Sequence, residues 1–205
     1  MSKELFSLGE LHIADFLKEE ESPKYPPHEL KLLLNDDGVV VLESQPPSGS
    51  MWKNQYWYRS SINFSMRKQL EDVVISILKV FKFKNSNPVF LDIASNDGYL
   101  LSCVPKEFTK IGIDPAPDSY KLEAEKYADL IIQDYFSAEV YKKNVHKRAD
   151  IITCISMLYD VQNIDGFLKD VVDVLNDNGV FVAQLSYTPA MLLGMFFDNV
   201  CHEHY

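Results

Sequence analysis

The chain ends on a run of side chains that can accept and orient protons. His202, Glu203 and His204 follow Cys201. An imidazole has an unperturbed pKa of about 6.5, so histidine is well matched to accept a proton near neutral pH. A solvated polar terminus stays open as an alternative. A cysteine hydrolase built on Cys201 is disfavoured, because nothing in the sequence supplies an evident oxyanion hole.

A loop suited to close contact with a small ligand follows a predicted strand at residues 89–93. The sequence there reads LDIASNDGYL. Ligands of doubly wound folds bind at the carboxyl ends of strands, so this loop is predicted to face the site. Its small residues let the backbone approach a ligand, and Asp92 or Asp97 can pair with a cationic amino group. The candidate cofactor-binding residues of this loop are Asp92, Ala94, Ser95, Asn96, Asp97 and Gly98.

The same loop departs from the pattern of dinucleotide-binding proteins. Ala94 and Asn96 stand where those loops prefer glycine. A positively charged sulfonium amino acid therefore fits the loop better than a pyrophosphate does.

Acidic residues also end the next two predicted strands. Asp114, in IGIDPAP, lies where an acidic side chain commonly binds both hydroxyls of a ribose. Asp134, in IIQDYF, is placed to accept from an adenine amino group, with Tyr135 and Phe136 as apolar walls. The alternatives are that Asp114 caps the next helix and that Asp134 caps a later turn. Together with the acidic residue at the end of the preceding strand, Asp114 and Asp134 favour an adenosine ligand.

Three more positions complete the predicted cofactor site. Pro115 follows Asp114, and Ser156 and Met157 follow the fourth predicted strand. Met157 is expected to be an apolar wall of the site, and core packing explains it almost as well.

The elements that must position these residues alternate along the chain. Short apolar runs separated by helical stretches after Pro88 indicate a mostly parallel sheet with helices on both faces, which is an α/β fold. Strands are predicted at 89–93, 110–114, 130–133, 151–155 and 179–186. Helices are predicted at 61–83, 99–103, 119–127 and 165–175, the last closed by Asn178 and Gly179.

Residues 1–58 are expected to form a small N-terminal lobe, and residues 59–205 the ligand-binding domain. Tandem prolines at 26–27 and 46–47 predict that no long element forms in the lobe. The loop at 35–38, NDDG, predicts a hairpin between strands at 29–34 and 39–42.

Composition excludes several classes of protein. A formal charge of -10 makes a nucleic-acid partner unfavourable, because such binding depends on clustered Lys and Arg. No apolar run is long enough for a membrane span, and no signal peptide is evident. The three cysteines form no CxxC pair, which predicts reduced thiols. We expect a cytoplasmic protein without a metal.

Four motifs in one order resemble the sugar C-methyltransferase family of S-adenosylmethionine-dependent enzymes. They are LDIASNDGYLL, IGIDPAP, the stretch from ISMLYD to VAQLSY, and FDNVCHEHY; the segment YWYRSSINFSM at residues 56–66 is similar as well. The resemblance implies a Rossmann-like class I methyltransferase fold, S-adenosylmethionine as cofactor with S-adenosylhomocysteine as product, and a nucleotide-linked keto sugar as acceptor.

The resemblance also implies roles for the terminal residues. His204 would be the base that generates an enolate, Glu203 would orient it, and His202 would line the pocket. Tyr58 would reach the enolate oxygen, although a packing aromatic is an alternative there.

Cys201 stands where many members of the family have Tyr, and Tyr159 and Asp160 stand where many have His. Two further departures concern whole parts of the family's design. The family's zinc lobe uses cysteines, and residues 1–60 contain none. The family's C-terminal domain is also missing from the sequence, so we expect either that more sequence belongs to the enzyme or that its substrate lid is lacking. The alternatives are a half-enzyme or non-catalytic module that binds the donor and needs a partner chain, and an O- or N-methyltransferase of a small metabolite.

Overall fold

The structure is a computed structural model that describes residues 2–12, 20, 22, 26–44, 57–82 and 86–196. The chain divides into two compact units. The smaller comprises residues 1–48, 159–162 and 185–205, and the larger comprises residues 49–158 and 163–184. Each unit is described by itself.

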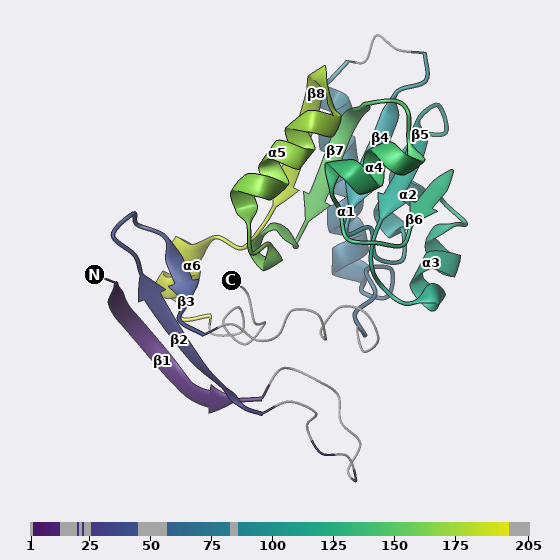
Figure 1. Cartoon of the computed structure of the whole chain (residues 1–205). Coiled ribbons are helices and arrows are strands. Elements are labelled where there is room, and N and C mark those ends of the chain that lie inside the picture. The colour runs from purple at the N-terminus through teal and green to yellow at the C-terminus, as the bar shows by residue number, and fades with distance from the viewer. Residues whose placement is uncertain are drawn as a thin grey trace. The chain divides into compact units, whose positions relative to one another are not determined.

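The larger unit is built on a five-stranded parallel sheet (Figure 1) in the order β6-β5-β4-β7-β8. The order changes direction between β4 and β7, where open α/β sheets bind ligands. Residue pairing aligns the ends of the three strands β4, β5 and β6, because Ile113 pairs with both Ile93 and Ile132. The strands are β4 (Val89–Ile93), β5 (Thr109–Ile113), β6 (Leu130–Ile132), β7 (Ala149–Ile155) and β8 (Leu175–Gln184).

Helices cover both faces of this sheet, as the sequence predicts. Phe90 and Ile151 pack against α1 and α2 on one face, whereas Leu91 and Ile152 pack with α4 and α5 residues on the other. Alternate side chains of a strand point to opposite faces, so one sheet serves two apolar layers. The helices are α1 (Phe64–Val80), α2 (Tyr99–Cys103), α3 (Asp118–Ala124), α4 (Ala138–Asn144) and α5 (Ile164–Val174), and a 3-10 turn, η2 (Leu158–Asp160), follows β7.

The smaller unit contains an antiparallel sheet of β1 (Lys3–Leu11), β2 (His28–Leu34) and β3 (Val40–Leu42). The predicted hairpin between β2 and β3 is confirmed. Its turn is closed by a hydrogen bond from the Gly38 amide to the Asn35 carbonyl, and Gly38 has a left-handed φ of 80°. Buried leucines of β2 and β3 pack with Met191 of α6 (Thr188–Gly194) in a small apolar core.

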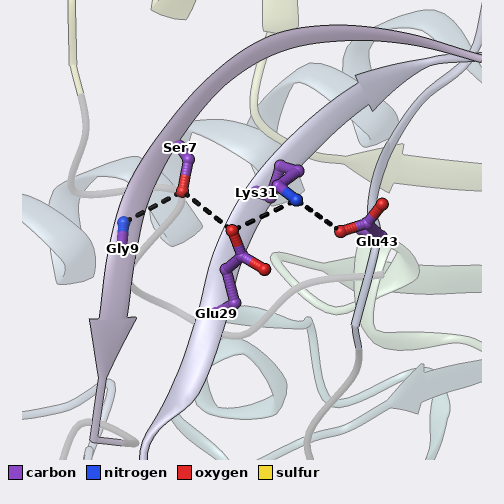
Figure 2. Close-up of polar contacts among 5 residues, drawn as sticks. All are labelled: Ser7, Gly9, Glu29, Lys31 and Glu43. Atoms are coloured by element: carbon purple, nitrogen blue, oxygen red, sulfur yellow. Dashed lines mark hydrogen bonds and ion pairs between the residues drawn. The ribbon is translucent and has the colours of Figure 1, made fainter.

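One part of this small sheet carries a polar cluster (Figure 2). Lys31 Nζ lies 3.1 Å from a carboxylate oxygen of Glu29 and 2.8 Å from one of Glu43. The hydroxyl of Ser7 donates to the same Glu29 oxygen. Hydrogen bonding to Glu43 and then to Glu29 raises the pKa of Lys31, so this ammonium stays charged. Both glutamates are exposed, so these ion pairs contribute little to stability.

Three expectations about elements are wrong. The N-terminal lobe does contain a long element, because β1 runs over nine residues. Asn178 and Gly179 do not end the last predicted helix: α5 ends at Val174, and β8 begins at the next residue and includes both. The predicted helix at 61–83 is shorter, since the Asn63 side chain accepts from the Met66 amide and caps α1. Helix α4 was not predicted.

Within the described ranges, no helix has the length and apolarity needed to cross a bilayer. The same residues contain no group of three or more His, Cys, Asp or Glu side chains able to hold a metal ion. Among the described residues, Cys103 is half-buried and Cys154 is buried.

Candidate functional site

The loop between β4 and α2 has an unusual backbone. Ala94, Asn96 and Gly98 all have left-handed φ values, of 59°, 51° and 78°. Such values cost energy for residues other than glycine and occur most often at functional sites. At Gly98 a side chain is also excluded by packing, because a Cβ atom would lie 2.6 Å from Cα of Ala124.

The carboxylate of Asp114 is held against this loop. One oxygen accepts from the Asn96 amide at 2.7 Å and the other from the Ala116 amide at 2.8 Å. Burial raises the pKa of Asp114, whereas these two bonds oppose the rise. Helix α3 begins at Asp118 after Pro117 and has no side-chain cap, so Asp114 does not cap that helix. A carboxylate oxygen can accept more than one hydrogen bond, so both oxygens retain acceptor capacity.

The loop also binds the residues that precede α1, which we call the pre-helix segment (residues 57–61). The Asn96 side chain donates to the Tyr58 carbonyl and accepts from the Ser60 amide, both at 3.0 Å. Asp97 accepts from the Ser61 amide at 3.1 Å. The side chain of Asn96 is therefore engaged with protein, and only its backbone contacts Asp114.

Two buried polar atoms of the loop have no hydrogen-bond partner among the described residues. They are Oδ1 of Asp97 and Oγ of Ser95, in side chains that are 0% and 4% exposed. A buried polar group without a partner costs about 1–3 kcal/mol, so such atoms mark a place where a polar ligand would be favoured.

Asp92 lies at the junction of β4 and β7, where the strand order changes. The Thr153 hydroxyl donates to it at 2.6 Å. Burial raises the pKa of Asp92 to about 7; the Thr153 bond lowers the pKa and the charge of Asp114 raises it further. Asp92 is therefore poised to gain or lose a proton near neutral pH.

The predicted adenine-side residues follow β5, β6 and β7. Asp134 is exposed, and its side chain accepts from the amide of its neighbour Tyr135. Phe136 packs edge-on against Phe167 at 5.3 Å between ring centroids. Met157 packs against the apolar core, so it contributes to packing. Pro115 is half-buried, and Ser156 is exposed with a left-handed φ of 55°.

The pre-helix segment supplies residues that the sequence reasoning missed. The guanidinium of Arg59 lies 4.0 Å above the ring of Tyr120 and donates to the Ser119 hydroxyl. Burial raises the pKa of Tyr120; the charge of Arg59 opposes the rise, and the charges of Asp97 and Asp114 add to it. The only sequence signal for Arg59 was its position in the motif at residues 56–66.

The four predicted catalytic residues are not all described. Tyr58 is half-buried; burial and then the charge of Asp97 raise its pKa, so it remains a protonated donor. His202, Glu203 and His204 lie outside the described residues, and the structure does not test whether they approach Tyr58.

The chain is similar to proteins of a known family. The family described as a methyltransferase domain matches residues 65–198, more than half of the chain. The chain belongs to this methyltransferase family. No curated protein matches the sequence significantly.

Solved structures are similar to this chain in fold. The plantazolicin methyltransferase BpumL, in complex with a pentazolic desmethylPZN analog and SAH, is 17% identical with a TM-score of 0.51. The match covers 71% of this chain and 59% of BpumL. The complex of BpumL with a triazolic analog and SAH gives 17% identity and a TM-score of 0.51, over 68% of this chain and 56% of BpumL. The match therefore spans less than two thirds of BpumL, and it supports the class I methyltransferase fold.

Proposed function

We propose that this methyltransferase takes its methyl group from S-adenosylmethionine and transfers it to carbon of a nucleotide-linked keto sugar. The observation that carries the donor assignment is the Asp114 carboxylate, fixed by two backbone amides at the end of β5 with acceptor capacity left over. A pair of ribose hydroxyls supplies two hydrogen-bond donors, which such a carboxylate can accept. The SAH in both BpumL structures supports the same donor.

The charge of the loop suits the other end of the donor. S-adenosylmethionine carries an ammonium group and supplies an electrophilic methyl group on a positively charged sulfur. The unpartnered Oδ1 of Asp97 would accept from the ammonium, and the positive charge would favour the ionised form of Asp92. The adenine would lie near Pro115, Asp134, Tyr135, Phe136, Ser156 and Met157.

Carbon must become nucleophilic before it can accept a methyl group. His204 would remove the proton from the carbon next to the keto group, and Tyr58 would donate to the carbonyl oxygen as it gains charge. The carbon then bonds to the methyl group while the sulfur leaves as S-adenosylhomocysteine. Glu203 would orient the imidazole, and His202 would line the acceptor pocket. This assignment rests on the resemblance of the terminal motif and on the protonated state of Tyr58.

A second candidate is a donor-binding half-enzyme that acts with a partner chain. The match to BpumL covers only 59% of that protein, so an acceptor-binding part can come from elsewhere. A cytoplasmic location stays a prediction from the number and spacing of the cysteines.

A methyl-transfer assay tests the proposal. Wild-type protein and His204→Ala are each incubated with S-adenosylmethionine and keto nucleotide sugars. Product analysis should find a new carbon–methyl bond with wild type, and a rate about 10²–10⁴-fold lower for the variant. Unchanged turnover by His204→Ala would instead favour an O- or N-methyltransferase. Activity that appears only with a second chain present would favour the half-enzyme.

A further inference from the structure

We propose that Asn96 is a positioning residue that couples donor binding to docking of the pre-helix segment. The inference rests on the proposed donor site. It assigns the Asn96 side chain to protein contacts and not to the ligand, and it makes residues 57–61 a wall of the site whose stability depends on the donor.

Asn96 contacts both the proposed donor site and the pre-helix segment. Its backbone amide donates to Asp114, the proposed ribose ligand. Its side-chain amide makes two bonds to the pre-helix segment, one donated to the Tyr58 carbonyl and one accepted from the Ser60 amide. One residue therefore joins the donor site to the segment.

The methyl donor and the pre-helix segment would both stabilise the same conformation of the loop between β4 and α2. Ala94 and Asn96 hold left-handed φ values that cost energy in the absence of compensating contacts. Docking of the segment supplies the bonds to Asn96 and the Ser61 bond to Asp97. The unpartnered Oδ1 of Asp97 leaves an acceptor for the donor's ammonium. Binding of the donor therefore lowers the entropy cost of docking the pre-helix segment, and docking of the segment lowers the entropy cost of binding the donor.

The pre-helix segment carries Tyr58 and Arg59. Tyr58 is the proposed hydrogen-bond donor to the acceptor, and Arg59 is fixed over Tyr120 and bonded to Ser119. When the donor stabilises the loop, it also stabilises the position of Tyr58. The acceptor's wall is then best formed when methyl donor is present.

The key variant is Asn96→Gly. Glycine accepts the left-handed φ of 51° and keeps the amide that donates to Asp114, so only the side-chain bonds to the segment are lost. Asn96→Asp keeps an oxygen for the Ser60 amide and removes the donor to Tyr58. Asn176→Ala is the matched control, because that amide also makes two bonds, to the Arg148 carbonyl and to Asp150, at the start of β7.

The measurement is tryptic cleavage after Arg59, followed by mass spectrometry with and without S-adenosylhomocysteine. Cleavage requires local opening of the segment. Without ligand, Asn96→Gly should be cleaved about tenfold faster than wild type, because two hydrogen bonds are lost. Asn96→Asp should also be cleaved faster, and Asn176→Ala should stay within about twofold of wild type.

Ligand should then reveal the coupling. S-adenosylhomocysteine should slow cleavage of wild type, and slow that of Asn96→Gly less. By reciprocity, calorimetry should give a dissociation constant for Asn96→Gly that is raised about tenfold. A purely structural role would change cleavage without changing the protection that ligand confers.

The outcomes separate the two proposals. If wild type binds ligand and Asn96→Gly binds it equally well, with equal protection, the coupling is wrong and the donor site stands. If wild type binds no S-adenosylhomocysteine, the donor site fails and the coupling fails with it. Equal cleavage of wild type and both Asn96 variants without ligand would overturn the positioning role of Asn96 by itself.

Discussion

The buried carboxyl of Asp92 should make the stability of the protein depend on pH, and Asp92→Asn should remove that dependence. Asp92 is 3% exposed, and burial is the main cause that raises its pKa to about 7 from its ordinary value of 3.8. As pH rises between these values, the unfolded chain releases a proton that the folded chain keeps. The folded state therefore loses stability across this window.

The size of the effect follows from the shift. A difference of roughly three pKa units, at about 1.36 kcal/mol per unit, gives about 4 kcal/mol of stability lost between pH 4 and pH 7. Asparagine carries no charge at any pH, and its carbonyl oxygen can still accept from the Thr153 hydroxyl. Asp92→Asn should thus gain on wild type by about 4 kcal/mol over the window.

Urea unfolding at a series of pH values from 4 to 8, followed by circular dichroism, measures this difference. The control is Asp129→Asn, which removes an exposed carboxylate that accepts from the Lys110 amide at the other end of the sheet. That carboxylate is in water, so its removal relieves no burial cost. If the free energies of unfolding of Asp92→Asn and wild type stay parallel from pH 4 to pH 8, the reasoning about Asp92 is refuted.

Two further substitutions test the loop and the acceptor side. Gly98→Ala should lower stability by about 1–3 kcal/mol and weaken S-adenosylhomocysteine binding, because its Cβ would collide with Ala124. The control Gly38→Ala has a similar φ but open space, so it should cost only about 1 kcal/mol and leave binding unchanged. Equal losses of stability in thermal unfolding would contradict the packing argument. Tyr58→Phe keeps the carbonyl that accepts from Asn96, so calorimetry should give an unchanged affinity for S-adenosylhomocysteine while methyl transfer slows by about a hundredfold or more; an unchanged rate would remove Tyr58 from the proposed chemistry.

The centre of the sheet was largely predictable because strands β4 and β7 are buried on both faces. Strand β4 is buried at all five positions, and its residues are apolar except for Asp92 next to the loop. The tandem prolines had predicted that the lobe contains no long element, but they lie outside strand β1. The residues of β1 are half-buried or exposed, so they leave only a weak apolar pattern in the sequence. The turn signal at Asn178 and Gly179 lies within β8, between Leu175 and Val180, where the pairing register with β7 shifts, so it marks an irregularity of the strand and not the end of α5.

The site was predictable only in part. The strand ends located Asp92 and Asp114, since parallel strands bring their carboxyl ends to one edge. The role of the Asn96 side chain was not visible, because its partners Tyr58 and Ser60 lie more than thirty residues earlier in the chain. The unpartnered oxygen of Asp97 likewise depends on burial, and no spacing in the sequence reports that.

Calorimetric titration of wild type, Asp114→Asn and Asp129→Asn with S-adenosylhomocysteine tests the donor site most directly. In Asp114→Asn an amide group replaces one of the two oxygens that accept from Asn96 and Ala116 and that would receive the ribose hydroxyls. Wild type and Asp129→Asn should bind at one saturable site, and Asp114→Asn should bind about tenfold to a hundredfold more weakly. Absence of saturable binding by wild type, or equal affinity of all three proteins, would contradict the account.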